Sequence, residues 1–194
     1  MKKSIVASLL IFSILACKKE VKKSESKSTE ISKTEKIQEP TKNSVFLSIQ
    51  LSPKSGSSVS GTTEFTENDG VVQMTAKIKG LSEGSHAIHI HDKGDCSSSD
   101  GKSSGGHWNP TAQPHGKWGA ETGYHKGDIG NFIVENTDKE TTVEFSTNEW
   151  CIGCGDDTKD ILGKGIIVHQ GVDDFTSQPS GAAGSRVSCG GIIQ

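Results

Sequence analysis

Six histidines and one aspartate in this chain stand at spacings that favour two adjoining metal sites. They are His89, His91, His107, His115, His125, His169 and Asp128. His89 and His91 are two residues apart in a strand-like run, so both imidazoles leave the same face of a sheet. Such a pair supplies one edge of the tetragonal site that Cu(II) favours. His107, His115, His125 and Asp128 lie in one Gly- and Pro-rich segment, and three nitrogens with one oxygen suit tetrahedral zinc.

Short strands from residue 44 onward are expected to position these side chains. Apolar runs predict strands at 45–51, 71–78, 131–134, 141–145 and 165–169, and no segment has helical periodicity beyond a turn or two. Many short strands with glycine-rich connections favour an antiparallel sandwich or barrel. Two irregular stretches, 92–128 and 170–185, exceed ordinary loop lengths. Long loops in a compact domain usually carry function.

Length and composition limit the remaining possibilities. The chain has 194 residues, 31% of them hydrophobic, and a formal net charge of −3. These values allow one compact domain with attachments, not two full domains. Nucleic acid is not an expected partner, because the sequence has no clustered basic face.

The first 17 residues have the features of an export signal. Lys2 and Lys3 precede an apolar stretch, Ile5 to Leu15, that is too short to span a bilayer. The stretch ends in Ile-Leu-Ala-Cys17, which resembles the bacterial lipobox, whose cysteine becomes the acylated N-terminus. The alternative is an ordinary signal peptide with an incidental cysteine. We therefore expect an exported protein of the bacterial periplasm or cell envelope, anchored to a membrane by lipid on Cys17.

Residues 18–43 are rich in Lys, Glu, Ser and Thr and have almost no apolar side chains. They are expected to form a disordered tether of about 30 Å. The folded domain is then residues 44–194. Apart from Cys17, the chain has four cysteines, for which three pairings are open, and export would allow them to oxidise. These are Cys96, Cys151, Cys154 and Cys189.

Six motifs in unbroken order resemble the copper/zinc superoxide dismutases. The resemblance covers about residues 44–194. The motifs are His89-Ile-His91, Gly106-His-Trp-Asn-Pro110, Pro114-His-Gly116, His125-Lys-Gly-Asp-Ile-Gly-Asn131, Ile167-Val-His169 and Gly184-Ser-Arg-Val-Ser-Cys-Gly190. It implies a Greek-key antiparallel β-barrel or sandwich with two long functional loops, and an enzyme that converts superoxide to oxygen and hydrogen peroxide.

The same resemblance implies a role for each site residue. Copper ligands would be His89, His91, His107 and His169, and zinc ligands would be His107, His115, His125 and Asp128. His107 would bridge the two metals as an imidazolate and carry a proton during catalysis. Arg186 would hold the superoxide anion, because a guanidinium offers planar donors and a permanent charge. Asp173 would link a copper histidine, His89, to a zinc histidine, His115, and Cys96 would pair with Cys189.

Some features lie outside this pattern. His86 has the opposite strand parity to His89 and His91, so it is expected to serve neither metal. For Cys151 and Cys154 a local disulfide, two free thiols, and an added metal or redox role all stay open. The stretch from Phe175 to Ser185 lacks the charged residues that guide superoxide in eukaryotic members. Lys93, Lys102, Lys126 and Lys164 are the alternatives, and Asp174 is expected to be solvated.

A binding protein is the competing functional class. A copper-buffering lipoprotein could use the same fold with little turnover, because a fold does not fix a function. Arg186 and a shared His107 favour the enzyme, since storage needs neither an anion clamp nor a bridging imidazole. A homodimer is compatible with the resemblance, but no patch in the sequence is diagnostic of a dimer face.

Overall fold

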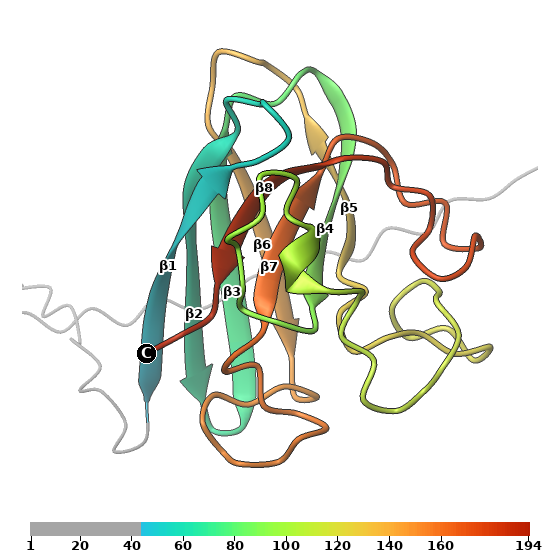
Figure 1. Ribbon diagram of the computed structural model, residues 1–194. Helices are drawn as coiled ribbons and strands as arrows, with labels where there is room; N and C mark the ends of the chain where they lie inside the picture. The colour runs from blue at the N-terminus through green and yellow to red at the C-terminus, as the bar shows by residue number, and fades with distance from the viewer. Residues whose placement is uncertain (1–43) are drawn as a thin grey trace, which may run out of the picture. The chain divides into compact units, whose positions relative to one another are not determined.

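Eight antiparallel strands make up the fold of residues 44–194, the part of the chain that the computed structural model describes (Figure 1). The expectations for the signal peptide, the tether and Cys17 lie outside these residues. The elements are β1 Val45–Pro53, β2 Ser60–Asn68, β3 Val71–Lys79, β4 Gly84–His91, the 3-10 turn η1 Lys102–Ser104, β5 Gly130–Val134, β6 Thr141–Thr147, β7 Gly165–His169 and β8 Arg186–Gly191.

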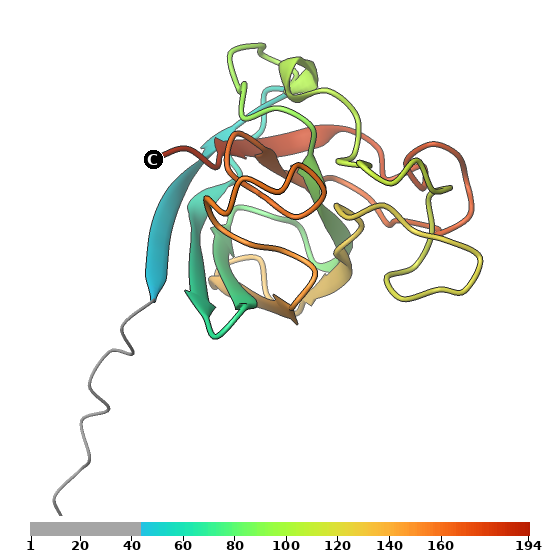
Figure 2. The same ribbon diagram turned by 90° about the horizontal axis from the view of Figure 1, so that it is seen from below.

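The strands form one sheet in the order β5-β4-β7-β8-β1-β2-β3-β6, which curls into a nearly closed barrel (Figure 2). Two connections skip strands: β3 leads to β4 across β6 and β5, and β6 leads to β7 across β5 and β4. These are Greek-key crossings. The predicted all-β Greek-key class is therefore confirmed. Within the described residues, no helix is long and apolar enough to span a bilayer.

The strands differ in how many of their faces are buried. Along β3, buried and exposed residues alternate, as expected for a strand with one face on the core and one in water. All five residues of β7 and the last six of β4 are buried. On β4, Ile88 and Ile90 belong to the apolar core, while His89 and His91 project from the other face. Loops cover that outer face, so its polar side chains are also withdrawn from water.

The β2 strand was not predicted, because the sequence Ser60–Asn68 has one large apolar residue. Phe65 is fully buried, and the rest of the strand is polar or small. It forms because β1 and β3 lie on either side and satisfy its backbone hydrogen bonds along its length. Strand formation here depends on partners that lie elsewhere in the sequence.

Three loops leave the barrel, and two of them lie together. The segment between β4 and β5 (92–129) and the segment between β7 and β8 (170–185) lie side by side next to β4 and β5 in both views (Figures 1 and 2). Their contact includes Gln178, whose side chain makes two hydrogen bonds to the backbone of His115. The third loop, 148–164 between β6 and β7, crosses the lower end of the barrel in Figure 1.

Two disulfides involve residues of these loops. Cys96 is joined to Cys189, which fixes the start of the 92–129 loop to β8. Cys151 is joined to Cys154 within the 148–164 loop. Of the three alternatives that the sequence left open for this second pair, the structure has the local disulfide.

Candidate metal centre

Strands β4 and β7 place three histidines on one outer face of the barrel. Their backbones are paired, with His89 opposite Ile167, and β7 ends at His169. The Nε2 atoms of His91 and His169 lie 3.4 Å apart. His91 Nδ1 donates to the carbonyl of Gly105 at 2.9 Å, which leaves Nε2 facing the cluster.

The 92–129 loop brings His107 against these three. Trp108 N–H donates to Ile90 O at 2.9 Å, and Ile90 N–H donates to Gly127 O at 2.9 Å, so two parts of the loop pair with β4. A Cβ at Gly127 would overlap Ile90 O, so this close approach requires glycine. The result is a buried four-nitrogen group of His89, His91, His107 and His169.

A second buried group, His107, His115, His125 and Asp128, shares His107 with the first. The oxygens of Asp128 lie 2.8 Å from His107 Nδ1, 3.0 Å from His115 Nδ1 and 3.3 Å from His125 Nδ1. Ligands about 2.0–2.1 Å from a tetrahedral ion lie about 3.3 Å from one another. The spacing of this group therefore fits a zinc ion.

Several ring nitrogens of the two groups have no hydrogen-bond partner among the residues that the structure describes. They are buried and comprise His89 Nδ1, His107 Nε2, His115 Nδ1 and His125 Nδ1. His115 Nδ1 lies 3.0 Å from Asp128 Oδ2 but is not aligned to donate to it. Buried polar atoms without partners are costly and rare. Converging nitrogens of this kind indicate that bound metal ions, not hydrogen bonds, satisfy them.

Asp173 links the two groups through one histidine of each. Its carboxylate accepts hydrogen bonds from His89 Nε2 at 2.9 Å and from His115 Nε2 at 2.8 Å. Asn131 holds the Asp173 backbone through two hydrogen bonds of 2.8 Å, and Phe175 N–H donates to Asp173 Oδ1. Burial acts to raise the pKa of Asp173, but hydrogen bonds from the two histidines outweigh it and lower the pKa. The carboxylate thus stays ionised and fixes the ring orientation of both histidines.

The histidines of the two groups differ in basicity. Burial lowers the pKa of His91, His169 and His107, the last to about 4. Burial opposes protonation of His115 too, yet Asp128 and Asp173 raise its pKa to about 9. His91, His107 and His169 are therefore neutral imidazoles ready to bind a metal ion. In the group that contains Asp128, a metal ion must instead displace a proton from His115.

A cleft of about 640 Å³ opens over the four-nitrogen group, and His91, His107, His169 and Arg186 line it. Arg186 Nη1 donates to Gly101 O at 2.9 Å and to Ser104 Oγ at 3.0 Å. The Cys96–Cys189 disulfide ties the loop that carries these acceptors to β8, the strand that carries Arg186. A half-buried guanidinium is thereby held in the same cleft as the histidines.

The four lysines considered as guides for the anion differ in their position relative to the cleft. Lys102 lines the cleft, next to Asp100, with which it pairs at 3.0 Å. Lys126 pairs with Glu149, and Lys164 lies 3.7 Å from Asp92. Lys93 is exposed and does not line the cleft.

Two further expectations concern residues outside the metal groups. His86 is buried but belongs to neither group, and its ring contacts the carbonyls of Ser82 and His169. Asp174 is exposed, and its carboxylate accepts hydrogen bonds from Thr176 and Ser177.

Several residues that support the site could not be recognised from the sequence. Gln178 clamps His115 from the 170–185 loop, and no spacing in the sequence links the two. Glu149 accepts a hydrogen bond from Tyr124 and pairs with Lys126, the two neighbours of His125. Both contacts bridge segments far apart in the chain, so motif spacing could not reveal them.

The fold and the two groups define an antiparallel β-barrel with a paired metal centre sharing one histidine. The sequence model of the family described as copper/zinc superoxide dismutase (SODC) matches residues 59–192. Copper-zinc superoxide dismutase 5 of Dictyostelium discoideum is 36% identical over 143 residues, covering 70% of this chain and 90% of that protein. The extracellular copper-zinc superoxide dismutase of Drosophila melanogaster is 35% identical over 145 residues, covering 69% and 75%.

The solved structure of a SOD-like protein from Bacillus subtilis superposes with a TM-score of 0.67 at 30% identity, covering 77% of this chain and all of that one. The chain belongs to the copper/zinc superoxide dismutase family. The predicted family and the copper and zinc cofactors are therefore confirmed.

Proposed function

We propose that the protein catalyses the dismutation of superoxide, in which two superoxide anions and two protons give oxygen and hydrogen peroxide. The observation that carries the proposal is the position of Arg186, which lines the same cleft as His91, His107 and His169. A permanent positive charge beside four converging nitrogens suits a small anion that reacts at a metal.

The two groups would hold different metals. Copper would be bound by His89, His91, His107 and His169, four nitrogens that suit its tetragonal preference. Zinc would be bound by His107, His115, His125 and Asp128, a set that suits its tetrahedral preference. When bound, copper supplies reversible one-electron chemistry, and zinc withdraws charge from the shared imidazole and orders the loop.

The protein's own residues then bind the anion and handle a proton. Arg186 attracts superoxide into the cleft and orients it through its guanidinium N–H groups. His107 Nε2 faces the four-nitrogen group, is buried and has no hydrogen-bond partner within residues 44–194, so it can hold a proton there and give it to the peroxide. Asp173 keeps the Nδ1 atoms of His89 and His115 directed at the metal groups by accepting from their Nε2 atoms.

Metal content and superoxide turnover of the purified protein test this function. Arg186→Ala should keep both metals and turn over superoxide more slowly, and His107→Ala should lose copper and zinc retention as well as turnover. His86→Gln is the matched control, because His86 belongs to neither group, and it should keep both metals. Full copper loading with negligible turnover in the unmodified protein would overturn the enzyme assignment and favour copper buffering.

We also propose that the protein is exported and anchored by lipid on Cys17. Two disulfides in the folded domain are typical of an oxidising compartment, and one relative is named as extracellular. The charged segment 18–43 would hold the enzyme off the membrane surface. Cys17→Ser should release the protein from the membrane fraction, and a variant that stayed bound would contradict the anchor.

A further inference from the structure

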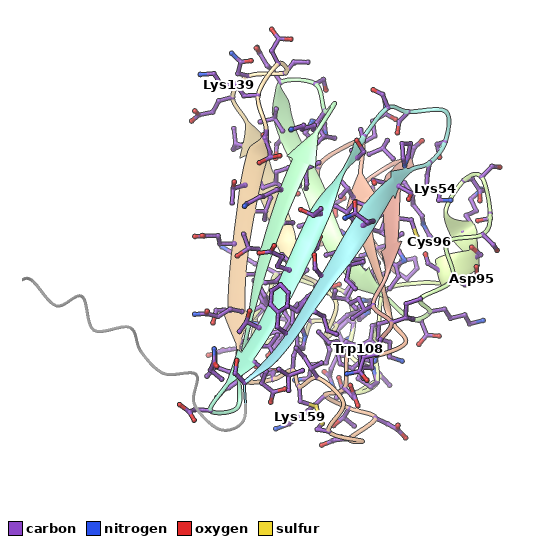
Figure 3. The ribbon with its side chains drawn as sticks, turned by 90° about the vertical axis from the view of Figure 1, so that its left-hand side faces the viewer. Lys54, Asp95, Cys96, Trp108, Lys139 and Lys159 are labelled. Atoms are coloured by element: carbon purple, nitrogen blue, oxygen red, sulfur yellow. A yellow bond between two sulfur atoms is a disulfide. The ribbon has the colours of Figure 1, made fainter. Side chains whose placement is uncertain are left out.

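The dismutase chemistry makes no use of the Cys151–Cys154 pair. None of the residues that line the cleft comes from its loop, 148–164. Figure 3 shows Lys159 of this loop at the lower end of the barrel, well separated from Cys96 and Lys54 at its side. This disulfide is therefore a separate feature of the molecule.

A carboxylate lies beside the two sulfurs. One oxygen of Asp160 and the Sγ atoms of Cys151 and Cys154 lie within 4.8 Å of one another. Asp160 Oδ2 accepts one hydrogen bond, from Gly155 N–H at 3.0 Å, and a carboxylate oxygen has two acceptor positions. Asp160 therefore retains the capacity to ligate a cation together with the two sulfurs.

Asp160 stays ionised in this position. Burial acts to raise its pKa, but hydrogen bonds from the N–H groups of Gly155, Leu162 and Gly153 lower the pKa below its usual value. The bonds from Gly153 and Leu162 to Oδ1 measure 2.9 and 3.0 Å.

Backbone contacts, besides the S–S bond, hold Cys151 next to Asp160. Cys151 N–H donates to Lys159 O at 2.9 Å, and Ile161 N–H donates to Cys151 O at 3.0 Å, so Cys151 is bridged directly to Asp160. Gly153, in the left-handed region at φ +73°, turns the chain so that Cys154 comes back to this bridge. Reduction would leave both thiols next to the carboxylate.

The second disulfide is also the easier one to reduce. It closes a sequence separation of 3, against 93 for Cys96–Cys189, and so removes less entropy from the unfolded chain. Cys154 is exposed, whereas Cys96 is half-buried and Cys189 is 1% exposed. An incoming thiolate therefore reaches Cys154 more readily than either cysteine of the Cys96–Cys189 disulfide.

We propose that the β6–β7 loop is a redox-gated site for a thiophilic divalent cation of the Zn²⁺ class, bound by Cys151, Cys154 and Asp160. Two thiolates and one carboxylate are ligands that zinc accepts, with a fourth position left to water. The disulfide is the closed form of the site and the dithiol is the open form.

The gating step consumes one dithiol reductant. Its thiolate attacks Cys154 Sγ, the S–S bond breaks, and Cys151 leaves as a thiolate. The reductant's second thiol then displaces Cys154 and closes a disulfide of its own, so that two electrons pass to the protein. The two protein thiols give up two protons to solvent when they bind the cation.

The first test uses the full-length protein loaded with copper and zinc. Limiting dithiothreitol followed by alkylation and peptide mass spectrometry should label Cys151 and Cys154 at least about tenfold faster than Cys96 and Cys189. After anaerobic removal of reductant, Cd²⁺ should give a thiolate-to-metal charge-transfer absorption that saturates at one equivalent. The histidine groups contain no thiolate, so this band reports the cysteine pair alone.

Single substitutions test which residues bind the cation. Cys154→Ser, at an exposed position, should remove the absorption band. Asp160→Asn should weaken Cd²⁺ binding by at least about tenfold, the order of loss seen when a supporting partner of a ligand is removed. Asp157→Asn is the matched control, because it removes an exposed charge from the same loop and should leave binding unchanged. Equal reduction rates for the two disulfides, or no charge-transfer band in the reduced protein, would overturn the proposal.

Discussion

Replacing Asp173 by asparagine should weaken copper binding far more than zinc binding. Asp173 Oδ1 accepts from Phe175 N–H at 2.7 Å and from His115 Nε2 at 2.8 Å, while Oδ2 accepts from His89 Nε2 at 2.9 Å. Two donors converge on Oδ1, so the amide oxygen of asparagine should take that place. Its NH₂ group then faces His89 Nε2, which is itself a donor when Nδ1 binds metal. The copper-type histidine loses its partner, and the zinc-type histidine keeps one.

The size of the effect follows from the burial of this contact. Asp173 is 1% exposed and His89 is fully buried, so water cannot replace the lost acceptor. A hydrogen bond to a charged group contributes about 1.5–3 kcal/mol. Loss of such a supporting partner costs about 10- to 100-fold in metal affinity, which is about 1.4–2.8 kcal/mol. We expect a loss of this order for copper and a loss of at most a few-fold for zinc.

Competition with chelators of known affinity measures both constants on the metal-free protein. Asp174→Asn is the control: it makes the same chemical change at the neighbouring residue, which is exposed and contacts neither histidine. Turnover at limiting copper should fall in parallel with copper occupancy. Equal losses of copper and zinc affinity, or a larger loss for zinc, would refute the assignment of donors and acceptors at Asp173.

Three other predictions concern single residues of the same centre. Burial opposes protonation of His115, but neighbouring carboxylates raise its pKa to about 9. Zinc binding at about pH 7.5 should therefore release about one proton from His115. Calorimetry in buffers of different ionisation enthalpy measures this release, and its absence would contradict the raised pKa. Because the pKa of His115 is raised in the folded state, its protonation stabilises the metal-free fold. This stabilisation is complete below about pH 6.5 and is lost as the pH rises through about 9. Arg186→Ala should lower kcat/KM by about one to two orders of magnitude at unchanged copper content; unaltered kinetics in a turnover assay would contradict the anion clamp. Gly181, at φ +65°, leaves no room for a Cβ beside Asp173 and His115, so Gly181→Ala should cost about 1–3 kcal/mol. Thermal unfolding should show a smaller loss for Gly119→Ala, where a Cβ meets nothing within 4 Å.

The apolar pattern predicted the strands in which it is clear and missed β2 and β8, in which it is weak. The runs at 71–78, 141–145 and 165–169 correspond to β3, β6 and β7, each extended by no more than two residues. β2 has a single large apolar side chain and is held by the strands on either side, so its own pattern was too weak. Strand register likewise depends on partners, which one sequence does not reveal.

The candidate centre was predictable where residue type and local spacing carry the information. The strand parity of His89 and His91 sets both rings on one face, and the structure places them on the outer face of β4. The contacts of Gln178 and Glu149 were not predictable, because each joins segments that have no fixed spacing. Which lysine lines the cleft was open for the same reason: Lys102 does so because of the path of the 92–129 loop.

By itself, the sequence determined the kinds of ligand atom available, their grouping along the chain, and the family to which they belong. Tertiary structure alone decided which ring nitrogen faces which group, which oxygen of Asp173 accepts from each histidine, and which acceptors hold Arg186 in the cleft. The physical reason is that donor chemistry belongs to each residue type. Orientation and basicity arise instead from burial and from partners that only the folded chain brings within hydrogen-bonding distance.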